Sequence, residues 1–148
     1  MTFYFLESTA LAKLFVQEKG SQEMIALVEP LSPPQKLISG LGVIEVHSAI
    51  RRRERMNELS SAQAIEALTI LSEEAALMTE QPMNGSVVET ARQMLDRHAL
   101  RALDAIQLAS CWMVRVASGI TDIVFVASDR DLTAAADAEG FQTWDPAL

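Results

Sequence analysis

The stretch Ile123–Ala127 limits the possible folds more than any other, because it is a continuous apolar run rich in β-branched residues. Such a run is typical of a strand that is buried on both faces, as strands of parallel sheets are. Three further short segments, Thr2–Leu6, Lys36–Ser39 and Phe141–Trp144, also favour strands. Helical segments lie between them. This alternation predicts an α/β fold with a central, mostly parallel sheet of roughly four to five strands, flanked by helices.

The segments between the strands carry apolar residues at helical spacing, which indicates helices. Gly119 and Gly140 stand where two of these helices should end. The segment Ala75–Gln81 fits either a helix end or an extended chain. There is no internal repeat and no linker, so residues 1–148 are predicted to form a single domain. Helices are expected over 10–15, 20–29, 42–55, from 60 or 61 to about 74, 86–97, around Asp104 to about 117, and from about 131 to 138.

The chain has a net charge of −8, which argues against broad electrostatic attraction to nucleic acid. A local cluster of acids that binds metal, a basic partner protein and plain solubility are all compatible with it. No apolar run approaches the roughly 18–20 residues of a membrane span, and no secretory signal is visible at the N-terminus. The single cysteine, Cys111, is interpreted as a buried structural thiol. These features predict a cytoplasmic protein without a membrane contact.

Four acidic residues occupy positions that usually hold apolar or small residues. Glu7 and Asp129 directly follow two predicted strands, while Glu45 and Asp104 lie on otherwise apolar helix faces. If these carboxylates converge, protonation or a cation must relieve their repulsion. Hard oxygen ligands select Mg²⁺ or Mn²⁺ rather than zinc. Simpler interpretations remain open, because Asp104 could pair with Arg101 three residues earlier and Glu7 could favour the dipole of the following helix.

A basic cluster ends the helix predicted over 42–55. A solvated helix end that favours the dipole is one interpretation of it, and a patch that contacts phosphates is the other. The cluster consists of Arg51, Arg52, Arg53 and Arg55.

Four segments together resemble the motifs of PIN-domain proteins, in order and spacing over essentially the whole chain. Phe5–Lys13 resembles the opening motif, in which a strand ends in an acid and a Ser/Thr-containing helix start follows. Ile44–Arg52 is similar to the second acidic motif, and His98–Ala109 is the most specific match, to the third. Phe125–Leu132 resembles the fourth. Within that family, the chain is most similar to the VapC-type ribonuclease toxins of toxin–antitoxin pairs.

This resemblance implies a divalent-metal-dependent endoribonuclease toxin of a type II toxin–antitoxin system, which hydrolyses RNA phosphodiesters. It further implies a homodimer and a cognate antitoxin as partner. One or two Mg²⁺ or Mn²⁺ ions would be held by the four carboxylates. The implied catalytic and metal-binding residues are Glu7, Glu45, Asp104 and Asp129, with Asp131 as a water-mediated ligand or a helix-start acid. Thr9 and Ser128 would support them, and Arg51, Arg52, Arg53 and Arg55 would contact RNA phosphates.

Two positions depart from the family pattern. The first acid of these proteins is usually Asp, and here it is Glu7, whose extra methylene moves the carboxylate by about a bond length. The small polar residue that is usual two positions before the fourth acid is Ala127, so a hydroxyl is missing unless Ser128 replaces it. The alternative function is therefore a catalytically weakened PIN-fold binding module, which engages antitoxin or RNA without efficient cleavage.

Overall fold

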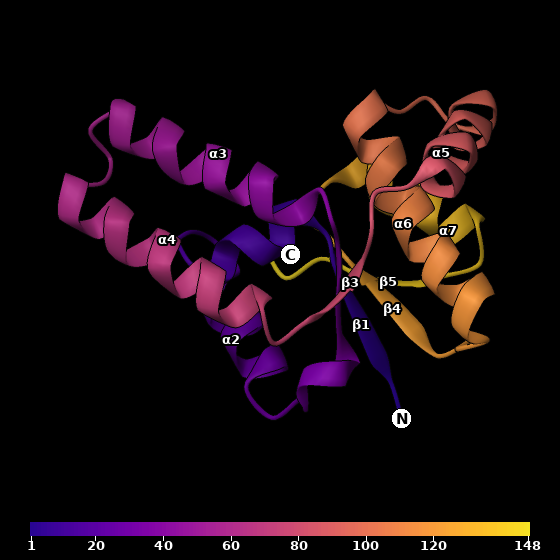
Figure 1. Cartoon of the computed structure of the whole chain (residues 1–148), viewed down its shortest axis with the longest axis horizontal. Coiled ribbons are helices and arrows are strands. Elements are labelled where there is room, and N and C mark those ends of the chain that lie inside the picture. The colour runs from indigo at the N-terminus through magenta and orange to yellow at the C-terminus, as the bar shows by residue number, and fades with distance from the viewer.

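The computed structural model covers residues 1–148 and contains five strands and seven α-helices (Figure 1). In chain order the elements are β1 (Phe3–Leu6), α1 (Ser8–Leu11), α2 (Ser21–Val28), β2 (Lys36–Ser39), α3 (Gly42–Arg55), α4 (Ser61–Ala75), β3 (Thr79–Gln81), α5 (Gly85–Arg97), α6 (Ala102–Ser118), β4 (Ile123–Val126), α7 (Arg130–Ala138) and β5 (Gln142–Trp144). Two short 3₁₀ turns, Ala12–Leu14 and Pro33–Gln35, follow α1 and α2.

The sheet is parallel throughout, with the strand order β3-β2-β1-β4-β5. From β1 the chain first builds outward through β2 and β3, and it then returns to the other side of β1 to add β4 and β5. The order therefore reverses between β1 and β4. In open α/β sheets, ligand sites lie at the carboxyl ends of the strands at such a reversal. The predicted fold class is confirmed, and all strands prove to be parallel.

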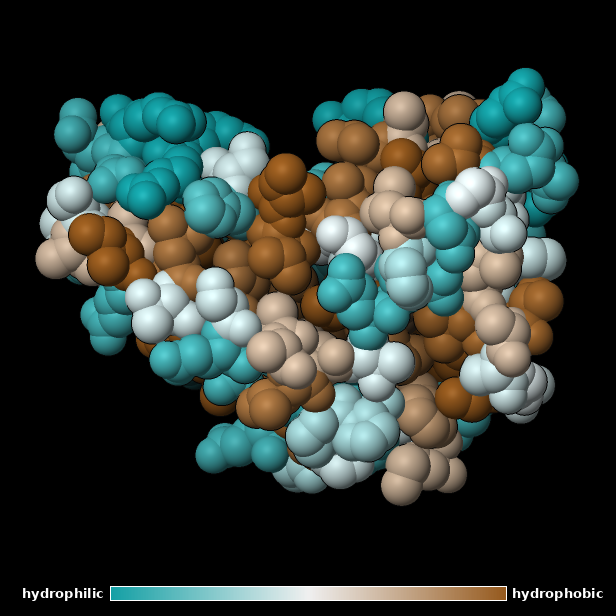
Figure 2. Space-filling view, in the orientation of Figure 1, coloured by the Kyte–Doolittle hydropathy of each residue, from teal (hydrophilic) through white to brown (hydrophobic).

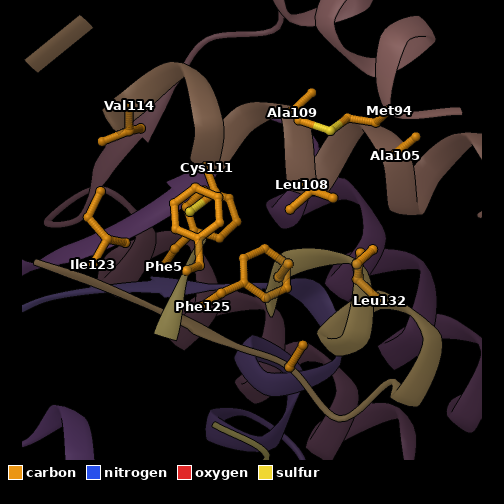
Figure 3. Packing of buried hydrophobic residues seen from close by; sticks show 14 of the residues in the cluster. Phe5, Met94, Ala105, Leu108, Ala109, Cys111, Val114, Ile123, Phe125 and Leu132 are labelled. Atoms are coloured by element: carbon orange, nitrogen blue, oxygen red, sulfur yellow. The ribbon is translucent and has the colours of Figure 1, made fainter. Parts of the chain in front are cut away.

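Successive residues of the strands point to opposite faces and enter two separate cores. Phe5 and Phe125 belong to the core beneath α5, α6 and α7, where their rings stack with centroids 5.6 Å apart (Figure 3). Their neighbours Leu6 and Val126 enter the other core, which α1 to α4 cover. The molecule is thus a sheet between two helical layers. Burial on both faces explains why the strand segments are apolar throughout.

Three local features of the structure refine what the sequence predicts. The ambiguous segment divides into the end of α4 at Ala75 and the exposed edge strand β3. In α4 the spacing of Ile65, Leu68 and Leu71 predicts one buried face; Leu71 is buried as expected, together with Ala64 and Ala67, whereas Ile65 is 57% exposed. Gly119 ends α6 as expected, with a left-handed φ of 73° that favours glycine. None of the helices is both long and apolar enough to cross a membrane.

Candidate functional site

A cleft of about 760 Å³ lies at the carboxyl edge of the sheet, between α3 and the start of α6. Figure 2 shows the molecule hollowed between these two parts. The four acids singled out in the sequence, which come from four distant parts of the chain, all line this cleft. They are Glu7, Glu45, Asp104 and Asp129. Thr9, Ser128, Arg52 and Arg53 line it too.

Each of the four acids stands at the start of a helix. Glu7 caps α1 and Asp129 caps α7, while Glu45 and Asp104 lie in the first turns of α3 and α6. Helix starts carry unpaired N–H groups and the positive end of the helix dipole, both of which stabilise negative charge. The fold therefore collects four helix starts around one cleft. This arrangement partly offsets the repulsion among the carboxylates.

The four carboxylates also share one pattern of hydrogen bonding. In each, one oxygen accepts bonds from the protein and the other accepts none. The free oxygens are Glu7 Oε1, Glu45 Oε2, Asp104 Oδ1 and Asp129 Oδ2. None of them is among the buried atoms that lack a partner. Each acid can thus offer one oxygen to a ligand in the cleft while the other fixes its orientation.

Glu7 is the most deeply buried of the four, with 2% of its surface exposed. Thr9 donates to its Oε2 from the backbone N–H at 2.9 Å and from the hydroxyl at 2.5 Å. The backbone N–H of Ser128 in turn donates to Thr9 Oγ1 at 2.8 Å, which links the ends of β1 and β4. Burial raises the pKa of Glu7 to about 7; the bonds from Thr9 oppose the rise, and the charges of Glu45 and Asp104 add to it.

Glu45 is held by two side chains from other elements. The hydroxyl of Ser8 donates to Glu45 Oε1 at 2.7 Å, and the amide Nε2 of Gln107 donates to the same oxygen at 2.8 Å. Gln107 is wholly buried and also donates to Ser8 Oγ at 2.7 Å. The three residues form a closed network of α1, α3 and α6 on one side of the cleft.

Asp104 and Asp129 are held more simply. Arg101 Nε donates to Asp104 Oδ2 at 3.3 Å, so the ion pair considered from the sequence does form. The Arg101 side chain is 85% exposed, however, and an exposed pair of this kind contributes little to stability. Asp129 Oδ1 accepts the backbone N–H of Leu132 at 3.0 Å, which is an ordinary helix cap.

The far side of the cleft is basic, but most of its charge is already neutralised. Lys13, which is 7% exposed, pairs with Glu18 at 3.0 Å, and Arg53 pairs with both Glu18 and Glu58, the latter at 4.0 Å. Arg52 also lines the cleft, is exposed and forms no ion pair. Of the other two arginines of the basic cluster, Arg51 pairs with Glu54 at 2.8 Å and neither lines the cleft. The cleft thus offers Arg52 as its available cation on this side.

Some predicted site residues lie elsewhere or act differently. Asp131 is exposed and lines a separate, smaller pocket beside Arg97 and His98, so the structure does not bring it to the four acids. The hydroxyl of Ser128 donates to Asp145 at 2.6 Å. Ser128 supports the site through its backbone N–H, which donates to Thr9.

The role of Gln107 was missed, although its position could be read from the sequence. It extends the three-residue spacing of Arg101 and Asp104 along α6. Ser8, which lies at the start of α1 where a serine commonly caps a helix, instead donates its hydroxyl to Glu45, and Glu7 provides the cap.

The donor set suits a small hard cation. Carboxylate oxygens are preferred by Mg²⁺ and Mn²⁺, and Mg²⁺ is commonly bound through only one or two carboxylates, with water and substrate phosphate completing its shell. In their present positions, no three acidic, histidine or cysteine side chains are close enough to hold one ion. The residues therefore fit an ion that takes one or two protein oxygens directly and reaches others through water.

Fold and cleft together define an α/β domain with an acidic site at the strand-order reversal. The PIN domain family model matches residues 4–138, and the chain belongs to that family. Ribonuclease VapC45 and Ribonuclease VapC49 of Mycobacterium tuberculosis, from strains CDC 1551 / Oshkosh and ATCC 25618 / H37Rv, are each 28% identical to it over 140 residues, covering 95% of this chain and 93% of theirs.

Two solved structures share the fold. PAE2754 from Pyrobaculum aerophilum has a TM-score of 0.64 at 19% identity, covering 98% of this chain and 90% of its own. FitAcB from Neisseria gonorrhoeae has a TM-score of 0.70 at 14% identity, covering 97% of this chain and 98% of its own.

Proposed function

We propose that this protein is a divalent-metal-dependent endoribonuclease and the toxin of a type II toxin–antitoxin pair. The observation that carries the proposal is the meeting of Glu7, Glu45, Asp104 and Asp129 in one cleft, each with one free oxygen. The relatives named as ribonucleases support RNA as the substrate. We assign the four acids as catalytic and metal-binding residues, with Mg²⁺ or Mn²⁺ as cofactor.

Different residues of the cleft have different roles in the proposed hydrolysis of a phosphodiester. A divalent ion held by these acids would supply Lewis acidity, polarise the phosphodiester and lower the pKa of a water bound to it. Thr9, which accepts the Ser128 N–H, orients Glu7, and the hydroxyl of Ser8 donates to Glu45. Such fixed donors keep the free oxygens in place without reorganisation during the reaction.

Arg52 is proposed to contact an RNA phosphate next to the scissile one. It is the unpaired arginine of the cleft, whereas Arg53 pairs with Glu18 and Glu58 and Arg51 pairs with Glu54. A single available guanidinium lets an acidic protein bind RNA locally while its net charge of −8 disfavours RNA elsewhere. Of the predicted basic patch, the proposal therefore retains Arg52 as the principal contact.

We further propose a homodimer and an antitoxin that covers the cleft with a basic segment. Ile44 in α3 is 65% exposed, and Leu103 at the cleft is 50% exposed. Exposed apolar side chains beside an acidic cleft suit a protein partner with apolar and basic residues. The cytoplasm is the proposed location.

Cleavage of RNA by purified wild-type protein and Asp104→Asn tests the proposal, with Mn²⁺ or Mg²⁺ and with excess chelator. Wild-type protein should cut only with metal, and Asp104→Asn should lose at least about 100-fold in rate. Asp137→Asn is the matched control, because Asp137 is an exposed acid of α7 outside the cleft. Equal cleavage by wild type and Asp104→Asn would reject the proposed site.

The second candidate is a binding module that engages antitoxin or RNA without efficient cleavage. It is favoured by Glu7, which stands where the family usually has Asp, and whose carboxylate folds back onto Thr9. If only the position of this carboxylate limits the rate, Glu7→Asp should raise cleavage on the order of 100-fold, the loss that a 1 Å misplacement can cause. Full activity of the wild type with no gain in Glu7→Asp would exclude the binding module.

A further inference from the structure

The side chain of Gln107, on α6, connects α1 and α3 through hydrogen bonds at the acidic cleft. Its Nε2 donates to Ser8 Oγ at 2.7 Å and to Glu45 Oε1 at 2.8 Å, and the side chain is wholly buried. Ser8 donates to the same oxygen of Glu45. Both donors therefore hold Oε1, and Oε2 is the oxygen left free.

The orientation that lets the amide nitrogen of Gln107 donate its hydrogen bonds leaves the amide oxygen without a partner. Gln107 Oε1 is the one buried side-chain nitrogen or oxygen in the structure without a hydrogen-bond partner. An unpaired buried acceptor is unfavourable, and such groups are rare in folded proteins. Exchanging the positions of Nε2 and Oε1 would place the amide oxygen next to the carboxylate oxygen of Glu45, and two acceptors repel each other. Gln107 Oε1 therefore stays without a partner because Nε2 has to face Glu45. A leucine would fill a similar volume without an unpaired buried acceptor and without repulsion between two oxygens.

We propose that Gln107, together with Ser8, is a positioning residue that turns Glu45 so that Oε2 faces the cleft. The inference rests on the proposed function, because Oε2 gains its role from a divalent ion. Groups that hydrogen-bond to ligating carboxylates orient them, and losing such a group typically weakens metal affinity or activity by about 10- to 100-fold. Gln107 itself touches neither substrate nor ion.

Gln107→Leu tests this role, and Ser110→Ala is its matched control. Ser110 is likewise wholly buried on α6 and hydrogen-bonded, but to Ser39 and Ile106. In titrations with Mn²⁺ alone, Gln107→Leu should bind about 10- to 100-fold more weakly than wild type. Ser110→Ala should bind as wild type does. If Gln107→Leu fails to fold, Gln107→Met, which is flexible and close in volume, replaces it.

A double-variant cycle separates positioning from general damage. In a Glu45→Gln background, Gln107→Leu should weaken Mn²⁺ binding less than about twofold further, because it acts through Glu45. A loss that persists at full size in that background would overturn the inference.

A crystal structure of metal-free Gln107→Leu gives a readout that needs no ion. The Glu45 carboxylate should leave its wild-type position, and an unchanged carboxylate would overturn the inference. Wild-type protein that binds no Mn²⁺ would reject the proposed function instead, while this crystal structure still decides whether Gln107 positions Glu45.

Discussion

Replacing Glu7 by glutamine removes a carboxyl group whose ionisation the fold opposes. Burial raises the pKa of Glu7 from 4.5 to about 7, and the side chain is 2% exposed, so solvent screening is small. At about 1.4 kcal/mol per pKa unit, that rise corresponds to about 3 kcal/mol of unfolding free energy. Glutamine keeps the size of the side chain and an oxygen that can accept the two bonds from Thr9.

The sign follows from where the proton is bound. Below pH 4.5 Glu7 is protonated in both the folded and the unfolded chain, so it causes no difference between them. Between about pH 4.5 and 7 the folded protein keeps a proton that the unfolded chain has lost. Its stability therefore falls as pH rises, and the loss is complete above about pH 7. Glu7→Gln has no such loss.

Urea unfolding of both proteins at pH 4.5, 6 and 8, without metal, measures the effect. The unfolding free energy of wild type relative to Glu7→Gln should drop by about 3 kcal/mol from pH 4.5 to 8. Using the difference cancels other groups that titrate, such as Glu139, whose pKa is lowered chiefly by its bond from Arg97. Glu23→Gln, at an exposed site without partners, should track wild type. A difference that stays constant within about 0.5 kcal/mol would refute the reasoning.

The site and the core carry three further predictions. On the proposed function, Mn²⁺ affinity of the wild type should fall about tenfold per pH unit below pH 7, because the ion would compete with the proton on Glu7, and calorimetry at several pH values measures this. Arg52→Ala should lower the slope of log affinity for single-stranded RNA against log salt by about 0.7, while Arg51→Ala should leave it unchanged, as salt titrations would report. Burial raises the pKa of the Cys111 thiol well above its usual range, so a thiol reagent should label it only after unfolding; fast labelling of folded protein would contradict its burial.

The fold was largely predictable because its strands have to be apolar on both faces. Segments such as Ile123–Val126 can only be covered by helices on each side, and this requirement decides the fold class. The edge strand β3 could not be recognised in this way. Its residues Thr79 and Glu80 are exposed, and its pairing with β2 depends on backbone bonds that any side chain permits.

The four acids could be found because a carboxylate at an apolar position is energetically unfavourable unless a cation or hydrogen bonds stabilise it. Their geometry could not be predicted, because it depends on contacts between residues far apart in the chain. Ser8 and Gln107 are separated by 99 positions, and only the folded chain shows that both hold Glu45. For Asp131 the sequence left two interpretations open, a water-mediated ligand and a helix-start acid, and the structure places it in the first turn of α7 at a separate pocket.

The shared pattern of one held and one free oxygen limits what the cleft can do with an ion. Four acids with one free oxygen each offer at most four protein ligands, and no three of them are gathered around one point. Mg²⁺ requires about six oxygens in near-ideal geometry, so water and an RNA phosphate have to supply the rest. On the proposed function, metal and RNA therefore bind cooperatively, because each completes the site for the other. The deep burial of Glu7 adds to this coupling, since burial makes its ionisation costly and a bound cation would offset that cost.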